Sequence, residues 1–193
     1  MTLHDTRVCT LGEGPLWHPE RQTLYWFDII GKKLMANTAE GPQEWQFDNY
    51  VSAAGWIDRD RILMASATGL WDFNLETGKR DLVVEMEADN PVTRSNDGRA
   101  DPWGGFWIGT MGINAEKGAG AIYRYYKGEV RQLFLGITIT NAICFAPDGS
   151  HAYFCDTMTR KIMRQPLVEL DGWLRDHVKD ALYRETKRSA RVD

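Results

Sequence analysis

The feature that most restricts the fold is a turn signal that recurs along the chain at a nearly constant interval. Each turn is marked by proline or an acidic residue, and the four signals lie at Pro19, Asp58, Asp101 and Pro147. Successive signals are 39, 43 and 46 residues apart. A period in the low forties, with several short strands in each period, is typical of the blades of a β-propeller. The spacing therefore predicts a repetitive all-β fold.

Segments rich in aromatic and β-branched residues fill the intervals in pairs and predict strands. The first is 23–29, followed by Gly31-Lys32-Lys33 as the turn of a hairpin. The other predicted strands are 61–66 with 69–74, 105–109 with 120–125, and 151–156 with 161–165. A β-sandwich has similar turn spacing and is the alternative. The recurring order of turn and strand favours the propeller.

Composition limits the partners of the chain. With 193 residues, 43% of them hydrophobic, the chain is long enough for one domain with a real core. The net charge of −4, with no basic run before the last residues, argues against nucleic acid and favours a small-molecule ligand. We see neither the apolar segment of a signal peptide nor the roughly 20 apolar residues of a membrane span. We therefore expect a cytoplasmic protein without a membrane partner.

The three cysteines, Cys9, Cys144 and Cys155, are scattered and odd in number, with no C-x-x-C pair. Disulfide or metal-ligand use is therefore not expected, and buried thiols are the prediction.

The densest group of polar side chains is Arg94, Asn96 and Asp97. It precedes a predicted turn at 101–105 and an aromatic strand at 106–110, so the group is expected at the mouth of a strand, where sites usually lie. Two interpretations stay open here. Asn-Asp-Gly is turn chemistry and the arginine a surface cation, or these hydrogen-bonding groups together bind a ligand.

Three further polar residues stand out. Glu13, in Gly-Glu-Gly-Pro, is expected in a turn that projects its carboxylate, as either a metal ligand or a solvated side chain. Asn141 interrupts the apolar run 136–145, so its amide needs a partner; a bulge or a cap is the alternative to a ligand role. Asp156, followed by Thr157, closes a predicted strand and is typical of local hydrogen bonding.

Together these motifs resemble the gluconolactonase, regucalcin and luciferin-regenerating-enzyme family. They are G-E-G-P, R-x-N-D-G followed by D-P, an aromatic strand ending in G-T-M, an asparagine before an apolar run and P-D-G, and a strand ending in Cys-Asp-Thr. The resemblance covers residues 10–166, with the motifs in the same order. It implies a six-bladed β-propeller with one divalent ion at the top of its central channel, in enzymes of carbohydrate metabolism that mostly open sugar lactones.

The resemblance also implies roles for single residues. Glu13 and Asn141 would be two of three protein ligands to the metal, and Arg94 and Asn96 would hold the hydroxyls of the sugar. A carboxylate and an amide carbonyl suit Ca²⁺, and the family also accepts Zn²⁺, Mn²⁺ or Mg²⁺. The cation would polarise the lactone carbonyl while a carboxylate takes a proton from the attacking water. In the family that carboxylate is the third ligand, an aspartate well beyond the position of Asp156; no matching motif follows here, so no catalytic residue is assigned.

The pattern of strands stops after Leu167. We therefore expect residues 1–166 to form about four blades of the six-bladed plan, and 167–193 to be an atypical tail, either helical or disordered. The tail is interpreted either as a cover for an open sheet edge or as the product of a truncated or frame-shifted gene. Open edges predict self-association or completion by another chain. Two other functions therefore stay open as alternatives to lactone hydrolysis. The chain is either a metal- or sugar-binding relative without catalysis, or an assembly module that a partner chain completes.

Overall fold

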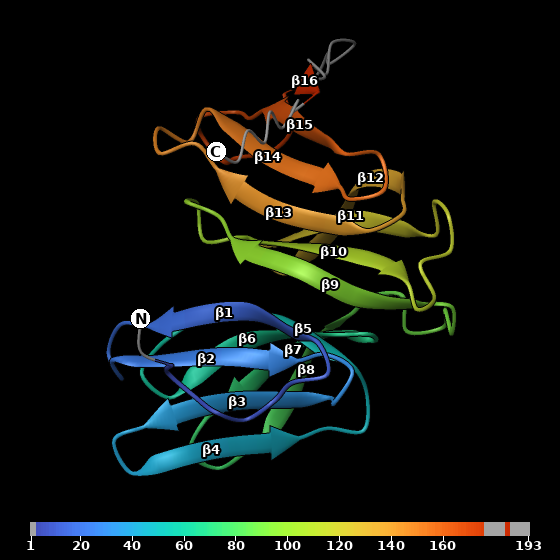
Figure 1. The fold of residues 1–193 in the computed structure, drawn as a ribbon. Coiled ribbons are helices and arrows are strands. Elements are labelled where there is room, and N and C mark those ends of the chain that lie inside the picture. The colour runs from blue at the N-terminus through green and yellow to red at the C-terminus, as the bar shows by residue number, and fades with distance from the viewer. Residues whose placement is uncertain (1–2, 176–183, 186–193) are drawn as a thin grey trace, which may run out of the picture.

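The computed structural model describes residues 3–175 and 184–185. These residues form four antiparallel sheets of four strands each, and every sheet is made of strands that follow one another in the chain (Figure 1). The fold is all-β, and the sheets are arranged as four blades of a β-propeller, as the turn spacing predicted. Within the described residues no helix is long and apolar enough to cross a membrane.

The strands follow the predicted repeat. Sheet 1 contains β1 (Gly12–His18), β2 (Thr23–Asp28), β3 (Lys33–Thr38) and β4 (Gly41–Gln46). Sheet 2 contains β5 (Val51–Trp56), β6 (Arg61–Ser66), β7 (Gly69–Asn74) and β8 (Arg80–Glu85). Sheet 3 contains β9 (Thr93–Ala100), β10 (Phe106–Gly112), β11 (Gly120–Tyr126) and β12 (Glu129–Ile137). Sheet 4 contains β13 (Thr140–Phe145), β14 (His151–Asp156), β15 (Lys161–Pro166) and β16 (Arg184–Glu185).

The four predicted turns have one structural role, because each connects the first strand of a sheet to the second. The first strands contact one another in series, β1 with β5, β5 with β9, and β9 with β13. These strands therefore form a common inner wall, and the repeat in the sequence corresponds to the repeat in space.

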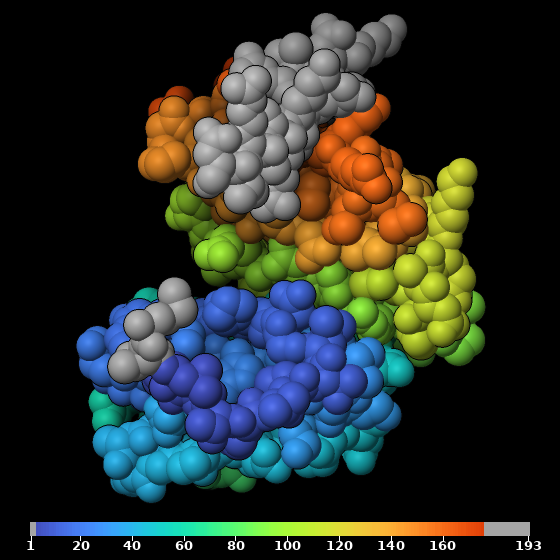
Figure 2. Space-filling model, in the orientation of Figure 1, coloured from blue at the N-terminus to red at the C-terminus, as the bar shows by residue number. Residues whose placement is uncertain are grey.

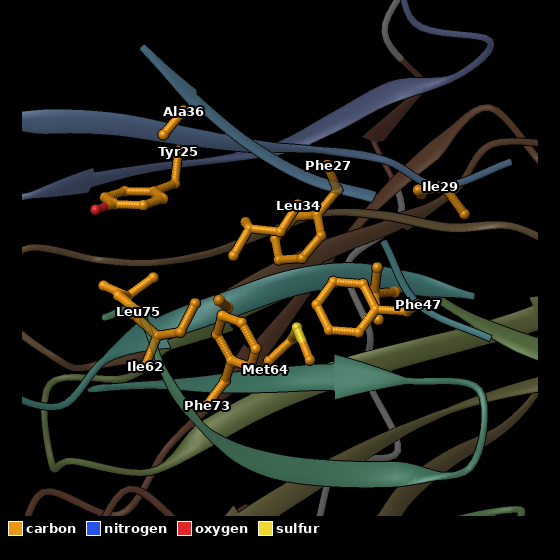
Figure 3. Packing of buried hydrophobic residues seen from close by; sticks show 12 residues of the cluster. Tyr25, Phe27, Ile29, Leu34, Ala36, Phe47, Ile62, Met64, Phe73 and Leu75 are labelled. Carbon is orange, nitrogen blue, oxygen red and sulfur yellow. The ribbon is translucent and has the colours of Figure 1, made fainter. Parts of the chain in front are cut away.

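An apolar layer joins sheet 1 to sheet 2 (Figure 3). Because side chains alternate along a strand, one face of β2 buries Tyr25 and Phe27, and these pack in the same cluster as Met64 and Phe73 from sheet 2. Burying a side chain of this size stabilises the fold by roughly 1.5–3 kcal/mol. The layer holds the first two blades together.

Similar layers join the remaining sheets. Leu70 and Phe106 belong to the cluster between sheets 2 and 3, and Trp107 and Phe154 to the cluster between sheets 3 and 4. Phe106 and Trp107, adjacent in β10, therefore pack on opposite faces of sheet 3. This alternation is typical of a strand that is buried on both sides.

Aspartates at the ends of the second strands tie sheets 1 and 4 to the segments that precede them. Asp156 accepts a hydrogen bond from the backbone N–H of Met158 at 3.1 Å, which confirms its predicted local role. It also accepts hydrogen bonds from the backbone N–H groups of residues 138 and 139 at 3.0 and 3.1 Å. Asp28 accepts the equivalent bonds from residues 10 and 11 at 2.9 and 3.0 Å. Burial by itself would raise the pKa of Asp28, but these N–H donors, together with the N–H of Gly31 and the charge of Lys33, outweigh it and lower that pKa.

The turn interpretation of Asn96-Asp97-Gly98 and the expected turn at Glu13 were wrong. Arg94, Asn96 and Asp97 lie inside strand β9, because this polar run pairs with β10. Glu13 lies in strand β1, which pairs with β2. Both strands are irregular at these positions, which accounts for their turn-like sequences.

The prediction of buried thiols was wrong for Cys144, which is exposed, while Cys9 and Cys155 are half-buried. All three are free, as expected. Cys9 contacts the sulfur of Met35 at 3.6 Å.

The tail does not leave the sheets at residue 166. Leu167 is buried between sheets 3 and 4 and pairs with Leu174. The Trp173 ring lies 4.4 Å from the guanidinium of buried Arg124. Strand β16 pairs with β15, so β-structure continues where the strand pattern of the sequence had stopped. The expectation that the tail is helical or disordered concerns mainly residues 176–183 and 186–193, which lie outside the described residues.

Candidate functional site

The inner wall is interrupted by a β-bulge in each first strand. In β1 the two residues after Glu13 face one residue of β2, and in β13 the two residues after Asn141 face one residue of β14. In β9 the bulge consists of Asn96 and Asp97 themselves, and β5 has a one-residue irregularity at Ser52. Bulges re-aim side chains and often lie next to active sites. Glu13, Asn96 and Asn141 lie in or beside these bulges, and Arg94 lies two residues before the bulge in β9.

Glu13 and Asn141 have the same local backbone. Each is followed by a residue in the left-handed region, Gly14 with φ 57° and Ala142 with φ 59°. At Gly14 an added Cβ would overlap the carbonyl oxygen of Ser52, so glycine allows β1 to approach β5 closely. The two candidate ligands, far apart in the chain, are therefore presented by equivalent bulges.

Asn96 connects the other predicted residues. Its Nδ2 donates to the carbonyl oxygen of Thr140 at 2.8 Å and to Oδ1 of Asn141 at 3.2 Å. Its Oδ1 accepts a hydrogen bond from Nη1 of Arg94 at 2.9 Å. Three of the four predicted residues thus form one hydrogen-bonded network across β9 and β13.

The amide of Asn141 is satisfied, as its position in an apolar run required. Nδ2 donates to Oγ1 of Thr157 at 2.8 Å, and Oδ1 accepts from Asn96. Since an amide oxygen has two lone pairs, Oδ1 keeps one for a further partner. A bulge and a ligand role were alternatives in the sequence; the bulge is observed, and it leaves the oxygen available.

Arg94 is almost fully buried, with 4% of its surface exposed. Its Nη1 donates to the backbone oxygen of Ser95 at 2.9 Å as well as to Asn96, while its Nε is buried and has no partner among the described residues. Burial lowers the pKa of Arg94, and attraction to Tyr50 and Glu13 partly opposes this. Glu13, exposed on β1, is thus close enough to act electrostatically on the network.

Asp97 is a member of the site whose role the sequence did not predict. Its Oδ2 accepts a hydrogen bond from the backbone N–H of Ile143 at 2.7 Å, and burial raises its pKa. The Asn-Asp-Gly motif was the available signal, and a turn was one of its two interpretations. Asp97 also lines a cleft of about 250 Å³ with Pro15, Trp56 and Arg99. Figure 2 shows the furrow where the blue surface of sheet 1 meets the green surface of sheet 3.

The donor types fit a hard cation, although the set is incomplete. Glu13 offers a carboxylate and Asn141 an amide oxygen, which are ligands that Ca²⁺ prefers. Within the part of the chain that the structure describes, no group of three or more His, Cys, Asp or Glu side chains could hold a metal. Because Ca²⁺ takes six to eight oxygens, water, substrate or other protein groups would have to supply the rest.

Comparison with known proteins supports the resemblance seen in the sequence. A family model described as SMP-30/Gluconolactonase/LRE-like region matches residues 11–185. A protein of Rhizobium meliloti (strain 1021), provisionally named a sugar lactone lactonase, is 44% identical over 163 residues, which are 83% of this chain and 54% of that protein. L-arabinolactonase of Azospirillum brasilense is 38% identical over 167 residues, covering 83% of this chain and 55% of that enzyme.

A solved structure agrees with these relatives. The crystal structure of regucalcin from Agrobacterium tumefaciens str. C58, described as a calcium-binding protein, superposes with a TM-score of 0.84 at 41% identity. The match covers 88% of this chain and 58% of that one. The chain therefore spans slightly more than half the length of the proteins it matches.

Proposed function

The chain belongs to the SMP-30/gluconolactonase/LRE-like family, and we propose that it carries one part of a divalent-metal-dependent site for the hydrolysis of sugar lactones. The observation that carries the proposal is the buried Nε of Arg94, which lacks a partner among the described residues and belongs to the network that reaches Asn141. A buried donor without an acceptor costs about 1–3 kcal/mol. An oxygen of a bound sugar lactone would remove that cost.

The residues have distinct roles in this proposal. Glu13 and Asn141 would hold the cation, which when bound polarises the lactone carbonyl and stabilises the negative charge that develops on it. Arg94 donates to substrate oxygens through Nε, and Asn96 fixes both Arg94 and the amide of Asn141. Hydrolysis adds water across the ring ester, breaks its C–O bond and releases a hydroxy acid. A carboxylate product remains compatible with the positive charge of Arg94.

The proposed activity is tested by following the opening of an aldonolactone, such as L-arabinonolactone or gluconolactone, by acid release. We expect opening above the spontaneous rate with Ca²⁺, Zn²⁺, Mn²⁺ or Mg²⁺, and its loss in EDTA. Arg94→Met should raise KM, because the buried donor to the sugar is removed. A rate that never exceeds the spontaneous rate with any of the four cations would contradict hydrolysis by this chain.

Metal binding is tested separately with Glu13→Gln, titrated with Ca²⁺ or Zn²⁺ by calorimetry. Loss of the anionic oxygen should weaken binding at least about tenfold, which corresponds to roughly 1.4 kcal/mol. Glu20→Gln is the matched control, because Glu20 is an exposed glutamate in the turn that follows β1. Equal affinities for Glu13→Gln and the unaltered chain would remove Glu13 from the set of ligands.

A second candidate is a metal- or sugar-binding relative without catalysis. The incomplete set of oxygen ligands in the described residues favours it. Calorimetric binding of Ca²⁺ or an aldonate together with no lactone opening would support this candidate over the hydrolase.

A further inference from the structure

The bulge in β13 requires support that the equivalent bulge in β1 does not. We propose that Asp97 is a positioning residue: it holds the β13 bulge in its strained conformation and thereby aims Asn141. The inference rests on the proposed role of Asn141 as a metal ligand, and it assigns to Asp97 a task separate from contact with metal or substrate.

The strain lies at Ala142, whose φ is 59°. A residue with a Cβ loses roughly 1–2 kcal/mol in this left-handed region. In β1 the same position is occupied by Gly14, which adopts φ 57° without that steric cost. The backbone conformation of the β13 bulge is therefore less favourable than that of the β1 bulge.

The second residue of the bulge also differs between the two strands. In β1 it is Pro15, which has no N–H, whereas in β13 it is Ile143, whose N–H lies outside the regular pairing with β14. That N–H donates to Oδ2 of Asp97 at 2.7 Å. Asp97 thus satisfies a backbone donor that exists in only one of the two equivalent bulges.

Asp97 and Asn96 hold the bulge from both sides of its strained residue. Asn96 bonds the carbonyl of Thr140 and the side chain of Asn141, before the strained residue, and Asp97 bonds the amide of Ile143, after it. If the bulge relaxed into regular pairing, the register would shift, and side chains on one side of it would change faces of the sheet. Loss of Asp97 should therefore misdirect Asn141 rather than remove a ligand.

The test uses four variants, Asp97→Ala, Asp97→Asn, Ala142→Gly and the double variant Asp97→Ala/Ala142→Gly, each titrated with Ca²⁺ by calorimetry. Asp97→Ala should weaken Ca²⁺ binding about tenfold, in the range seen when a ligand loses its supporting hydrogen bond. Asp97→Asn should stay close to the unaltered chain, because its amide oxygen still accepts from Ile143. Glycine at position 142 should restore most of the affinity lost in Asp97→Ala, because the bulge is then unstrained.

Rescue by glycine distinguishes positioning from other roles of Asp97. If Asp97→Asn binds Ca²⁺ as weakly as Asp97→Ala, the carboxylate acts through its charge and the proposal is wrong. If the double variant is no better than Asp97→Ala, the strain at Ala142 is not what Asp97 offsets. Asp48→Ala, which removes an exposed carboxylate, should leave the affinity unchanged.

A second readout separates this inference from the proposed function. If the unaltered chain binds no Ca²⁺, the metal site fails, and the positioning is then measured by hydrogen exchange at the amide of Ile143. Asp97→Ala should speed that exchange, and adding Ala142→Gly should slow it again. Identical exchange in the unaltered chain and Asp97→Ala would overturn the inference whatever the metal does.

Discussion

At the scale of single residues, the site depends on Asn96 more than on the residues it connects. Its side chain is 7% exposed and bonds Arg94 on one side and Asn141 on the other. The sequence motifs single out Asn141 because a polar residue in a strand-like run needs a partner, and Arg94 and Asn96 because they belong to a dense polar group whose roles the family resemblance implies. Those motifs do not indicate which groups the partners are.

We expect Asn96→Ala to lower the free energy of unfolding by about 2–3 kcal/mol, because the buried Nη1 of Arg94 loses an acceptor and the carbonyl of Thr140 loses a donor. Urea unfolding followed by tryptophan fluorescence measures the change. Asn114→Ala, at an exposed position, should change it by less than about 0.5 kcal/mol. Similar midpoints for the two variants would show that the network contributes no stability.

At the scale of strands, the bulges explain why the inner wall carries unusual residues. Gly14 is in the left-handed region and lies against the backbone of β5, so β1 can approach β5 only without a side chain there. A glycine in a strand normally weakens it, and here it allows the contact between two blades.

Gly14→Ala should destabilise the chain by roughly 2 kcal/mol, since the new Cβ meets both the left-handed φ and the carbonyl oxygen of Ser52. Thermal unfolding checks the loss. Gly104→Ala is an informative comparison, because Gly104 also has a positive φ, 81°, but no atom within 4 Å of an added Cβ. Equal losses would mean that the backbone conformation alone accounts for the effect.

Asp28, at the end of β2, predicts a dependence of stability on pH. Because the pKa of Asp28 is lower in the folded chain, its contribution is present above the unfolded value near 3.9 and is lost as pH falls through the folded value. Asp28→Asn should therefore be less stable than the unaltered chain at pH 7, and the gap should shrink at acidic pH. Urea midpoints at pH 7 and at about pH 3 measure it. A gap that stays constant would exclude the ionised carboxylate as the cause.

At the scale of the whole molecule, three apolar layers join four sheets in a row, and the two end sheets each have a face outside these layers. On sheet 4 that face carries Tyr153, Cys155 and Ile162, which alternate with side chains buried toward sheet 3. Ile162 is 44% exposed, and no further sheet lies over this face in the described part of the chain. His151 and Arg164 share this face, and its exposed apolar side chain, Ile162, favours association.

We therefore expect self-association that grows with concentration, measured as a molar mass above 22.1 kDa by light scattering after size exclusion. Ile162→Glu should shift the distribution toward the monomer, because a charge on the face disfavours its burial. Glu40→Gln, at an exposed position near β4, is the control. A constant monomer mass across the concentration range would contradict this expectation.

Local sequence was enough to predict the repeat, the second strand of every sheet, the third strands of sheets 2, 3 and 4, and the turns before the second strands, because these depend on neighbours along the chain. Proline and aspartate at Pro19, Asp58, Asp101 and Pro147 favour turns locally, and alternation of apolar residues predicts strands locally. Tertiary contacts were needed to establish that the polar run at 94–97 is a strand and that Asp97 holds the bulge beside Asn141. Both depend on hydrogen bonds between segments more than ten residues apart, and local preference does not specify which of those bonds form.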